Sequence, residues 1–165
     1  MLISLSDWLL DVDIELTMEI SASQAQEHCT CGYCRNYYAG LDQNYPTIRP
    51  FLSKFGLNAE APDELCPFEP TIYEANYIVQ GKILRSGSIP LWIDDVPLKI
   101  CAPEQADICT EHPLPYFVLR LGLLDLPWSL SEPMDQVVSP ANEEEFLQRM
   151  QQKLLQRCDE SAILS

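Results

Sequence analysis

Three cysteines fall within six residues of this chain: Cys29, Cys31 and Cys34. Side chains two residues apart in an extended chain point to the same side, so the sulfurs of Cys29 and Cys31 can face one point. Gly32 permits a tight turn, and Cys34 can come back toward that point where a helix begins. The chain must therefore fold so that a loop and the first turn of a helix hold three sulfurs together.

Converging thiolates at this spacing are typical of a metal site, and zinc lies about 2.3 Å from each cysteine sulfur that binds it. A structural zinc ion takes a fourth protein ligand, whereas a catalytic one leaves that position to water. His28 should point away from Cys29 in an extended chain, so we favour a more distant cysteine. The predicted zinc ligands are Cys29, Cys31, Cys34 and Cys66, with Cys101, Cys109 and His112 as alternatives to Cys66.

Two other interpretations of the three cysteines stay open. Cys34 should lie at a helix N-terminus next to Arg35, and both the helix dipole and the guanidinium favour a reactive thiolate. Cys31 and Cys34 would then form a redox pair. Alternatively, the three cysteines are small side chains that pack as buried hydrophobic groups.

The length of 165 residues suits one domain with its own hydrophobic core. We predict a single domain over residues 1–165, with a frayed tail at 157–165. No run of about 18 apolar residues is present, so no membrane span is expected. Residues 1–10 lack a basic segment and a cleavage site, and the seven cysteines are an odd number. These features indicate a cytoplasmic protein whose clustered thiols bind metal or do redox chemistry.

The charge of the chain is strongly negative: 25 acidic residues stand against 10 basic ones, for a net charge of -15. Nucleic acids and anionic membranes carry the same sign and would be repelled. We therefore predict no nucleic-acid and no membrane partner. A basic protein is the partner that this charge favours.

Hydrophobic patterning predicts a mixture of strands and helices. Residues 11–21 alternate apolar with acidic or polar side chains, the pattern of a strand with one wet face. Apolar residues recur every three or four positions over 37–55, which predicts helix with an interruption at 44–46 and a stop at Gly56. The further predicted strands are 71–85, 89–93, 96–101 and 116–126, and the predicted loops are 58–70 and 102–115.

A last helix is predicted to begin at Ser139 and Pro140, which are typical N-cap and first helical residues. The expected fold class is therefore α+β. An antiparallel sheet or small β-sandwich of about five or six strands should carry a helical segment after the cysteines and a C-terminal helix.

The pattern Cys29-x-Cys31-x-x-Cys34-Arg35, followed by Gly40, resembles a motif of the glutathione-dependent formaldehyde-activating enzyme family. In that β-rich family the motif C-x-C-x-x-C-(R/Q/K) binds zinc, so the resemblance implies a zinc ion at these cysteines. The further cysteine pairs of that family have no counterpart in this chain.

A longer part of the chain is similar to a small bacterial family of uncharacterised proteins. Its members share an HCxCxYCRN(Y/F) cluster, a helix after it, and a late strand that ends in a sequence motif with proline and tryptophan. The matching stretches here are 28–37 and Leu126-Pro127-Trp128-x-Leu130-x-Glu132-Pro133. This resemblance implies no activity.

No acid, base or nucleophile motif stands out beyond the cysteines, and we predict no catalytic residues. The expected function is a cytoplasmic binding or interaction module with a cysteine-rich, zinc-binding site. One alternative is an enzyme that uses the zinc or a thiol on a small molecule, which requires a cavity at the cysteines. The other is an acidic immunity-type protein that neutralises a basic partner.

Overall fold

The computed structural model describes residues 1–69 and 71–134, which form seven strands and four helices. The strands are β1 (Leu2–Leu5), β2 (Trp8–Val12), β3 (Glu64–Glu69), β4 (Ile72–Arg85), β5 (Leu91–Ile93), β6 (Val96–Cys101) and β7 (Tyr116–Asp125). The helices are α1 (Ile14–Gln26), α2 (Gly32–Asn44), α3 (Ile48–Ser53) and α4 (Pro103–Ala106). The α+β class is confirmed, and the described strands outnumber the five or six that were expected.

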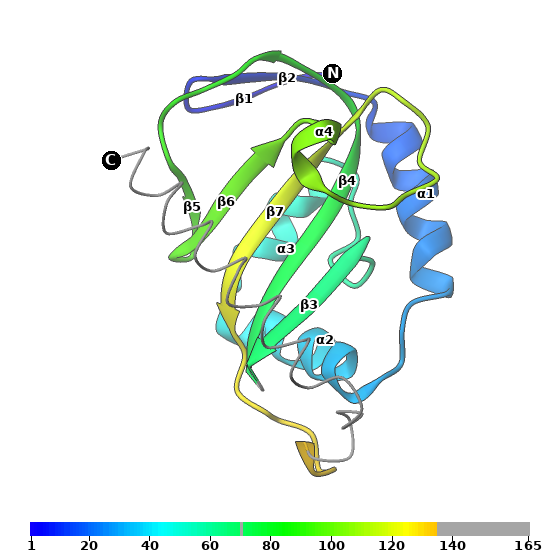
Figure 1. Cartoon of the computed structure of the whole chain (residues 1–165), viewed down its shortest axis with the longest axis vertical. Helices are drawn as coiled ribbons and strands as arrows, with labels where there is room; N and C mark the ends of the chain where they lie inside the picture. The colour runs from blue at the N-terminus through cyan, green and yellow to red at the C-terminus, as the bar shows by residue number, and fades with distance from the viewer. Residues whose placement is uncertain (70, 135–165) are drawn as a thin grey trace.

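The strands form one antiparallel sheet in the order β1-β2-β4-β7-β6-β5, and β3 adds to β4. β4 has β7 along one edge, while β3 and β2 share the other edge (Figure 1). β3 pairs with the first part of β4 and β2 with its last part. One long strand therefore joins the β1–β2 hairpin to the rest of the sheet.

Gly81 marks the point on β4 where the pairing with β2 begins. It lies opposite Val12, and its φ is 154°, a value that side chains with a Cβ rarely adopt. A Cβ atom at this position would lie 2.1 Å from the carbonyl oxygen of Asp11. Only glycine therefore lets β2 approach β4 so closely.

Two hydrophobic clusters lie on the two faces of the sheet. The larger one joins the sheet to α2 and α3, and its fully buried large side chains include Leu10, Tyr37, Leu41, Ile48, Leu52, Phe55, Tyr73, Tyr77 and Phe117. The smaller one comprises Ile78, Cys101, Ala106 and Val118 and lies under α4. In Figure 1, α2 and α3 lie behind the sheet and α4 lies in front of it. The predicted aromatic and aliphatic row over 37–55 is thus core.

The prediction of a strand over residues 11–21 is wrong, because β2 ends at Val12 and α1 begins at Ile14. Asp13 is the N-cap: its carboxylate accepts a hydrogen bond from the Leu16 amide at 3.0 Å. A capped first turn satisfies a backbone donor that a strand would have placed in a ladder.

The inward side of α1 is polar, which is why the apolar pattern was misleading. Thr17 and Ser21 are buried, while Met18 is exposed. The Thr17 hydroxyl donates to the Asp13 carbonyl at 2.7 Å and accepts from the Gln80 amide at 3.0 Å. Hydrogen bonds through Thr17 therefore help to hold the start of this helix against β4.

The predicted interruption at 44–46 is confirmed: α2 ends at Asn44 and α3 begins at Ile48. Gly56 follows α3 with a φ of 82°. A Cβ atom there would lie 2.7 Å from the Ile14 carbonyl oxygen, so glycine also allows α1 to pack closely.

The strands from β4 onward agree with the predicted ranges. The prediction of a loop over 58–70 is wrong, because β3 lies inside this range. In the 102–115 range, α4 forms a single short helix. The predicted helix from Pro140 and the predicted tail at 157–165 lie outside the described residues. Within those residues, the helices are too short and too polar to cross a membrane.

Candidate metal centre

The sulfurs of Cys29, Cys31 and Cys34 lie within 4.8 Å of one another, which confirms that the three side chains converge. Cys29 is in the loop between α1 and α2, and Cys31 is the N-cap of α2. Cys34 stands in the first turn of that helix, so its side chain returns toward the loop. The Cys31 amide donates to the Cys29 sulfur at 3.5 Å, and this contact folds the loop back on itself.

The three thiols have unequal affinities for their protons. The hydrogen bond from the Cys31 amide lowers the pKa of Cys29 below its usual 9.0. Burial, and then hydrogen bonding with the Cys31 thiol, raise the pKa of Cys34 well above that value. Three adjacent negative sulfurs repel one another, so only a bound cation would stabilise all three thiolates together.

Side chains of α2 fix the loop that carries the cysteines. The Tyr38 hydroxyl donates to the Cys29 carbonyl at 3.2 Å, and Arg35 Nε donates to the Thr30 carbonyl at 2.8 Å. Arg35 also forms an ion pair with Glu132. This pair raises the pKa of Arg35 and lowers the pKa of Glu132, chiefly through the hydrogen bond between them.

The two stretches of the bacterial-family resemblance pack against each other. Asn36 is fully buried, and its side-chain amide donates to the Leu126 carbonyl at 3.2 Å and accepts from the Ser129 amide at 2.8 Å. The Tyr33 and Trp128 rings meet edge to face at 5.7 Å. The segment after β7 therefore braces the first turn of α2, which holds Cys34.

A cavity of about 510 Å³ opens beside the three sulfurs. Its lining includes all three cysteines, His28 and Tyr38 on one side, and Asp63 from the segment before β3 on the other. The His28 ring packs against the Tyr38 ring with centroids 4.8 Å apart and planes tilted by 39°. The cysteines are thus reachable from a pocket as well as from the surface.

Cys66 is not brought into the group of three sulfurs. It lies on β3, where its neighbours Leu65 and Pro67 line the cavity. Side chains alternate along a strand, so Cys66 belongs to the other face of β3, and its thiol donates to Glu64 at 2.9 Å. Its role as fourth ligand stays a prediction.

The alternative ligands are also elsewhere. Cys101 is buried in the hydrophobic cluster under α4, and that burial raises its pKa. Cys109 is exposed, and His112 lies with it beside a different cavity of about 460 Å³.

His112 belongs to a buried polar cluster that the sequence did not reveal. Its Nε2 lies 2.7 Å from a carboxylate oxygen of Asp63, and its Nδ1 lies 3.0 Å from the Gln80 amide nitrogen. Gln24 donates to the same Asp63 oxygen at 2.7 Å, and the Ile78 amide donates to the other at 2.6 Å. The Gln24 amide nitrogen also lies 3.0 Å from Nε2, so each ring nitrogen of His112 contacts a side-chain amide.

We call Gln24, Asp63, Gln80 and His112 the histidine cluster. The sequence offered no local signal for it, because its members come from a helix, a strand and two loops. Gln24 and Asp63 line both the cysteine cavity and the cavity beside His112. The two polar clusters are therefore neighbours.

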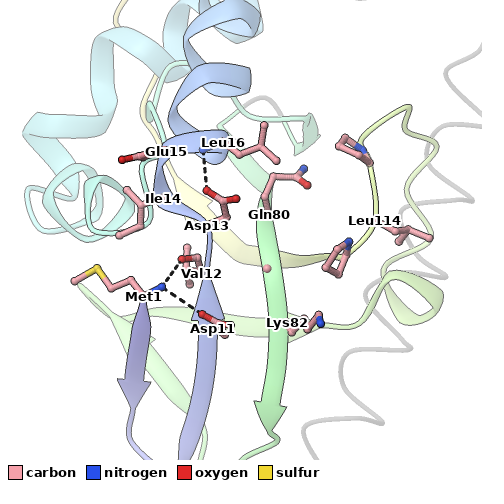
Figure 2. A pocket seen from close by; sticks show the side chains of 13 residues that line it. Met1, Asp11, Val12, Asp13, Ile14, Glu15, Leu16, Gln80, Lys82 and Leu114 are labelled. Carbon is pink, nitrogen blue, oxygen red and sulfur yellow. Dashed lines mark hydrogen bonds and ion pairs between the residues drawn. The ribbon is translucent and has the colours of Figure 1, made fainter.

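A further cavity, of about 690 Å³, lies at the other end of α1 (Figure 2). Figure 2 shows the Met1 amino group donating to the Asp11 carboxylate at 3.2 Å and to the Val12 carbonyl at 2.8 Å. Asp13 is occupied by its capping bond to Leu16. Met1, Asp11 and Asp13 are thus already paired, in contrast to Nδ1 of His28 beside the cysteines.

Comparison with known proteins adds no relative: no protein-family model matches the chain, and neither a curated protein nor a solved structure does. The function must therefore be argued from the site itself.

Proposed function

We propose that Cys29, Cys31 and Cys34 bind a zinc ion and that the protein is a cytoplasmic binding module rather than a catalyst. The observation that carries the proposal is the mutual distance of the three sulfurs, which lie within 4.8 Å of one another. Thiolate sulfur is a soft ligand, and tetrahedral sulfur-rich sites are typical of zinc.

The start of α2 supports a cluster of negative sulfurs. A helix N-terminus carries a partial positive charge, and its first amides lack partners within the helix. Cys31 occupies the N-cap without a side-chain hydrogen bond to those amides, so its sulfur stays available to a metal. The Cys31 amide already donates to the Cys29 sulfur, as backbone amides commonly do to metal-bound thiolates.

A role in binding rather than turnover is supported by what surrounds the cysteines. The loop and the first turn of α2 are tied to residues 126–132 through Arg35, Asn36 and Tyr33. A zinc ion at this junction would lock the loop and the segment after β7 into one surface. The net charge of -15 supports a basic protein as the partner of that surface.

A second candidate function is favoured by the cavity of about 510 Å³ at the cysteines. An enzyme on a small molecule would need this space and an open coordination position on the zinc. The occupant of the fourth coordination position therefore separates a closed, structural zinc site from a catalytic one.

The test is the metal content of untagged protein purified without added metal or chelator. Wild-type protein should carry about one zinc ion per chain, and Cys31→Ser should carry almost none. Cys109→Ser is the matched control, because it removes an exposed cysteine outside the cluster and should leave the zinc in place. Wild-type protein that binds no zinc even when zinc is supplied would refute the proposal.

A further inference from the structure

His28 brings an unsatisfied nitrogen to the cysteine cavity. Its Nδ1 atom is buried and has no hydrogen-bond partner among the described residues. A buried polar atom without a partner destabilises the folded state, so native proteins rarely keep one without a reason. Metal coordination would be one such reason, and His28 lines the same cavity as the three cysteines.

Tyr38 holds His28 on the same side as the sulfurs. Its ring packs at a tilt against the His28 ring, and its hydroxyl donates to the carbonyl of Cys29. The Tyr38 hydroxyl also interacts with the Cys34 thiol, one of the effects that accompany burial in raising the pKa of Tyr38. One tyrosine thus contacts the histidine and two of the three cysteine residues.

We propose that Nδ1 of His28 is the fourth ligand of the zinc ion, which makes the site Cys₃His with ligands from positions 28, 29, 31 and 34. This inference rests on the proposed zinc site. Imidazole nitrogen is a common fourth ligand beside three thiolates, and the metal would satisfy the buried nitrogen.

Binding of one ion by all four ligands would require the loop to close. Tetrahedral zinc with bonds of about 2.3 Å to sulfur places its sulfurs about 3.8 Å apart. The sulfurs here lie within 4.8 Å of one another, and the His28 nitrogens are outside that group. Residues 27–31 form neither helix nor strand, so rotation of the ring and a small backbone shift can bring the four ligands together.

This geometry also gives a reason to prefer His28 over Cys66. His28 and Cys29 both line the cavity, so the chain here is not the extended one in which neighbouring side chains diverge. Moving Cys66 to the sulfurs would require its strand to turn over, which would break the pairing of β3 with β4. A ring rotation in a loop is far less disruptive.

Cobalt titration tests the ligand set, because the absorption of bound cobalt reports the number of thiolates and the coordination geometry. We would titrate metal-free wild-type, His28→Asn, Cys66→Ser and Cys31→Ser proteins with cobalt and then displace it with zinc. His28→Asn should weaken zinc binding by more than about 100-fold, since even residues that only orient a ligand contribute about 10–100-fold. Cys66→Ser should leave both affinity and spectrum unchanged.

The outcomes separate the two proposals. Wild-type protein that binds neither metal would refute the zinc site itself. Tight binding with His28→Asn equal to wild type would refute His28 alone and leave the zinc site standing. A changed spectrum in Cys66→Ser would assign the fourth position to Cys66. A wild-type spectrum that shifts on addition of free imidazole would show an open position and also refute His28.

Cadmium NMR on wild-type protein gives a readout that does not depend on any variant folding. With isotope-labelled histidine, a coupling between cadmium and Nδ1 of His28 is expected. A cadmium shift typical of four sulfurs, or of three sulfurs without a nitrogen coupling, would overturn the inference.

Discussion

The cysteine cluster (Cys29, Cys31 and Cys34) and the histidine cluster both border α1. They differ in how many of their polar groups have a hydrogen-bond partner within the protein. The Asp63 carboxylate accepts from Gln24, His112 and the Ile78 amide, and the Gln80 side chain pairs with the other ring nitrogen of His112. The side chains of Asp63 and His112 are 5% and 9% exposed. Buried groups that are fully paired hold a structure together and leave little capacity for a ligand.

The cysteine cluster has the opposite character. Cys29 and Cys31 are exposed, the sulfurs are close without being bonded, and Nδ1 of His28 lacks a partner among the described residues. The comparison thus contrasts a fully paired cluster with the one proposed to bind zinc, and four experiments test this contrast.

The largest effect should come from metal removal. At zinc concentrations about 1,000 times the dissociation constant, binding to the folded state stabilises wild-type protein by about 4 kcal/mol. Chelation should remove this contribution from wild-type protein and Cys109→Ser but leave Cys31→Ser unchanged. Urea unfolding with and without chelator measures the difference. An equal response of all three proteins would mean that the cysteine cluster is not the zinc site.

Asp63→Ala should destabilise the fold by about 3 kcal/mol, because it leaves the Ile78 amide, His112 and Gln24 without their shared acceptor. Its zinc content should stay at the wild-type level. The control is Glu111→Ala, which removes an exposed acid from the same loop as His112. If Asp63→Ala kept full stability but lost zinc, the assignment of the two clusters would have to be exchanged.

Alkylation should reveal unequal cysteines in metal-free protein. The lowered pKa of Cys29 gives it more thiolate at pH 7 than Cys34, whose pKa burial raises. Mass spectrometry of partly alkylated protein should therefore show Cys29 modified well before Cys34, by about tenfold or more. Zinc should protect both. Equal rates in the metal-free protein would contradict the described loop geometry.

The smallest effect concerns the ion pair between Arg35 and Glu132. The pKa of Glu132 is lowered in the folded state from its ordinary value of 4.5. The ion pair therefore stabilises the folded protein in full at pH values above 4.5. That contribution is lost as the pH falls through the lowered folded-state pKa. Urea unfolding over a pH series should show Glu132→Gln slightly less stable than wild type near neutrality and equal to it in acid. A gap that widens in acid would contradict the pairing.

The convergence of three sulfurs could be predicted because all the information lies within six residues. The spacing of the cysteines and the start of the helix depend only on neighbouring residues. Rules on side-chain direction and helix termini therefore predict them well. The break between α2 and α3 and the hairpin at Asp94 and Asp95 are of the same kind. Both aspartates adopt positive φ values, which suits a two-residue turn between β5 and β6.

The parts of the structure that were predicted wrongly depend on residues far apart in the sequence. Alternation over 11–21 predicted a strand, but the buried side of α1 is made of Thr17 and Ser21, whose partners lie far along the chain. Ser21, for example, accepts a hydrogen bond from the Asn58 amide at 2.8 Å. Polar burial has no hydrophobic periodicity, so a pattern search cannot detect it.

The histidine cluster escaped prediction for the same reason. Asp63 and His112 are separated by almost a third of the chain, and their contact exists only because β4 brings the two loops together. His112 therefore has the appearance of an ordinary loop residue in the sequence, yet it is buried.

Gly81 has a consequence for how this fold can vary during evolution. Its backbone lies so close to Asp11 that any side chain would separate the β1–β2 hairpin from the sheet. Lineages without the proposed zinc ion could replace the cysteines and keep the fold, but they could not replace this glycine. Across homologous sequences, a glycine at this position of the long central strand should thus outlast the cysteine motif as the mark of common descent.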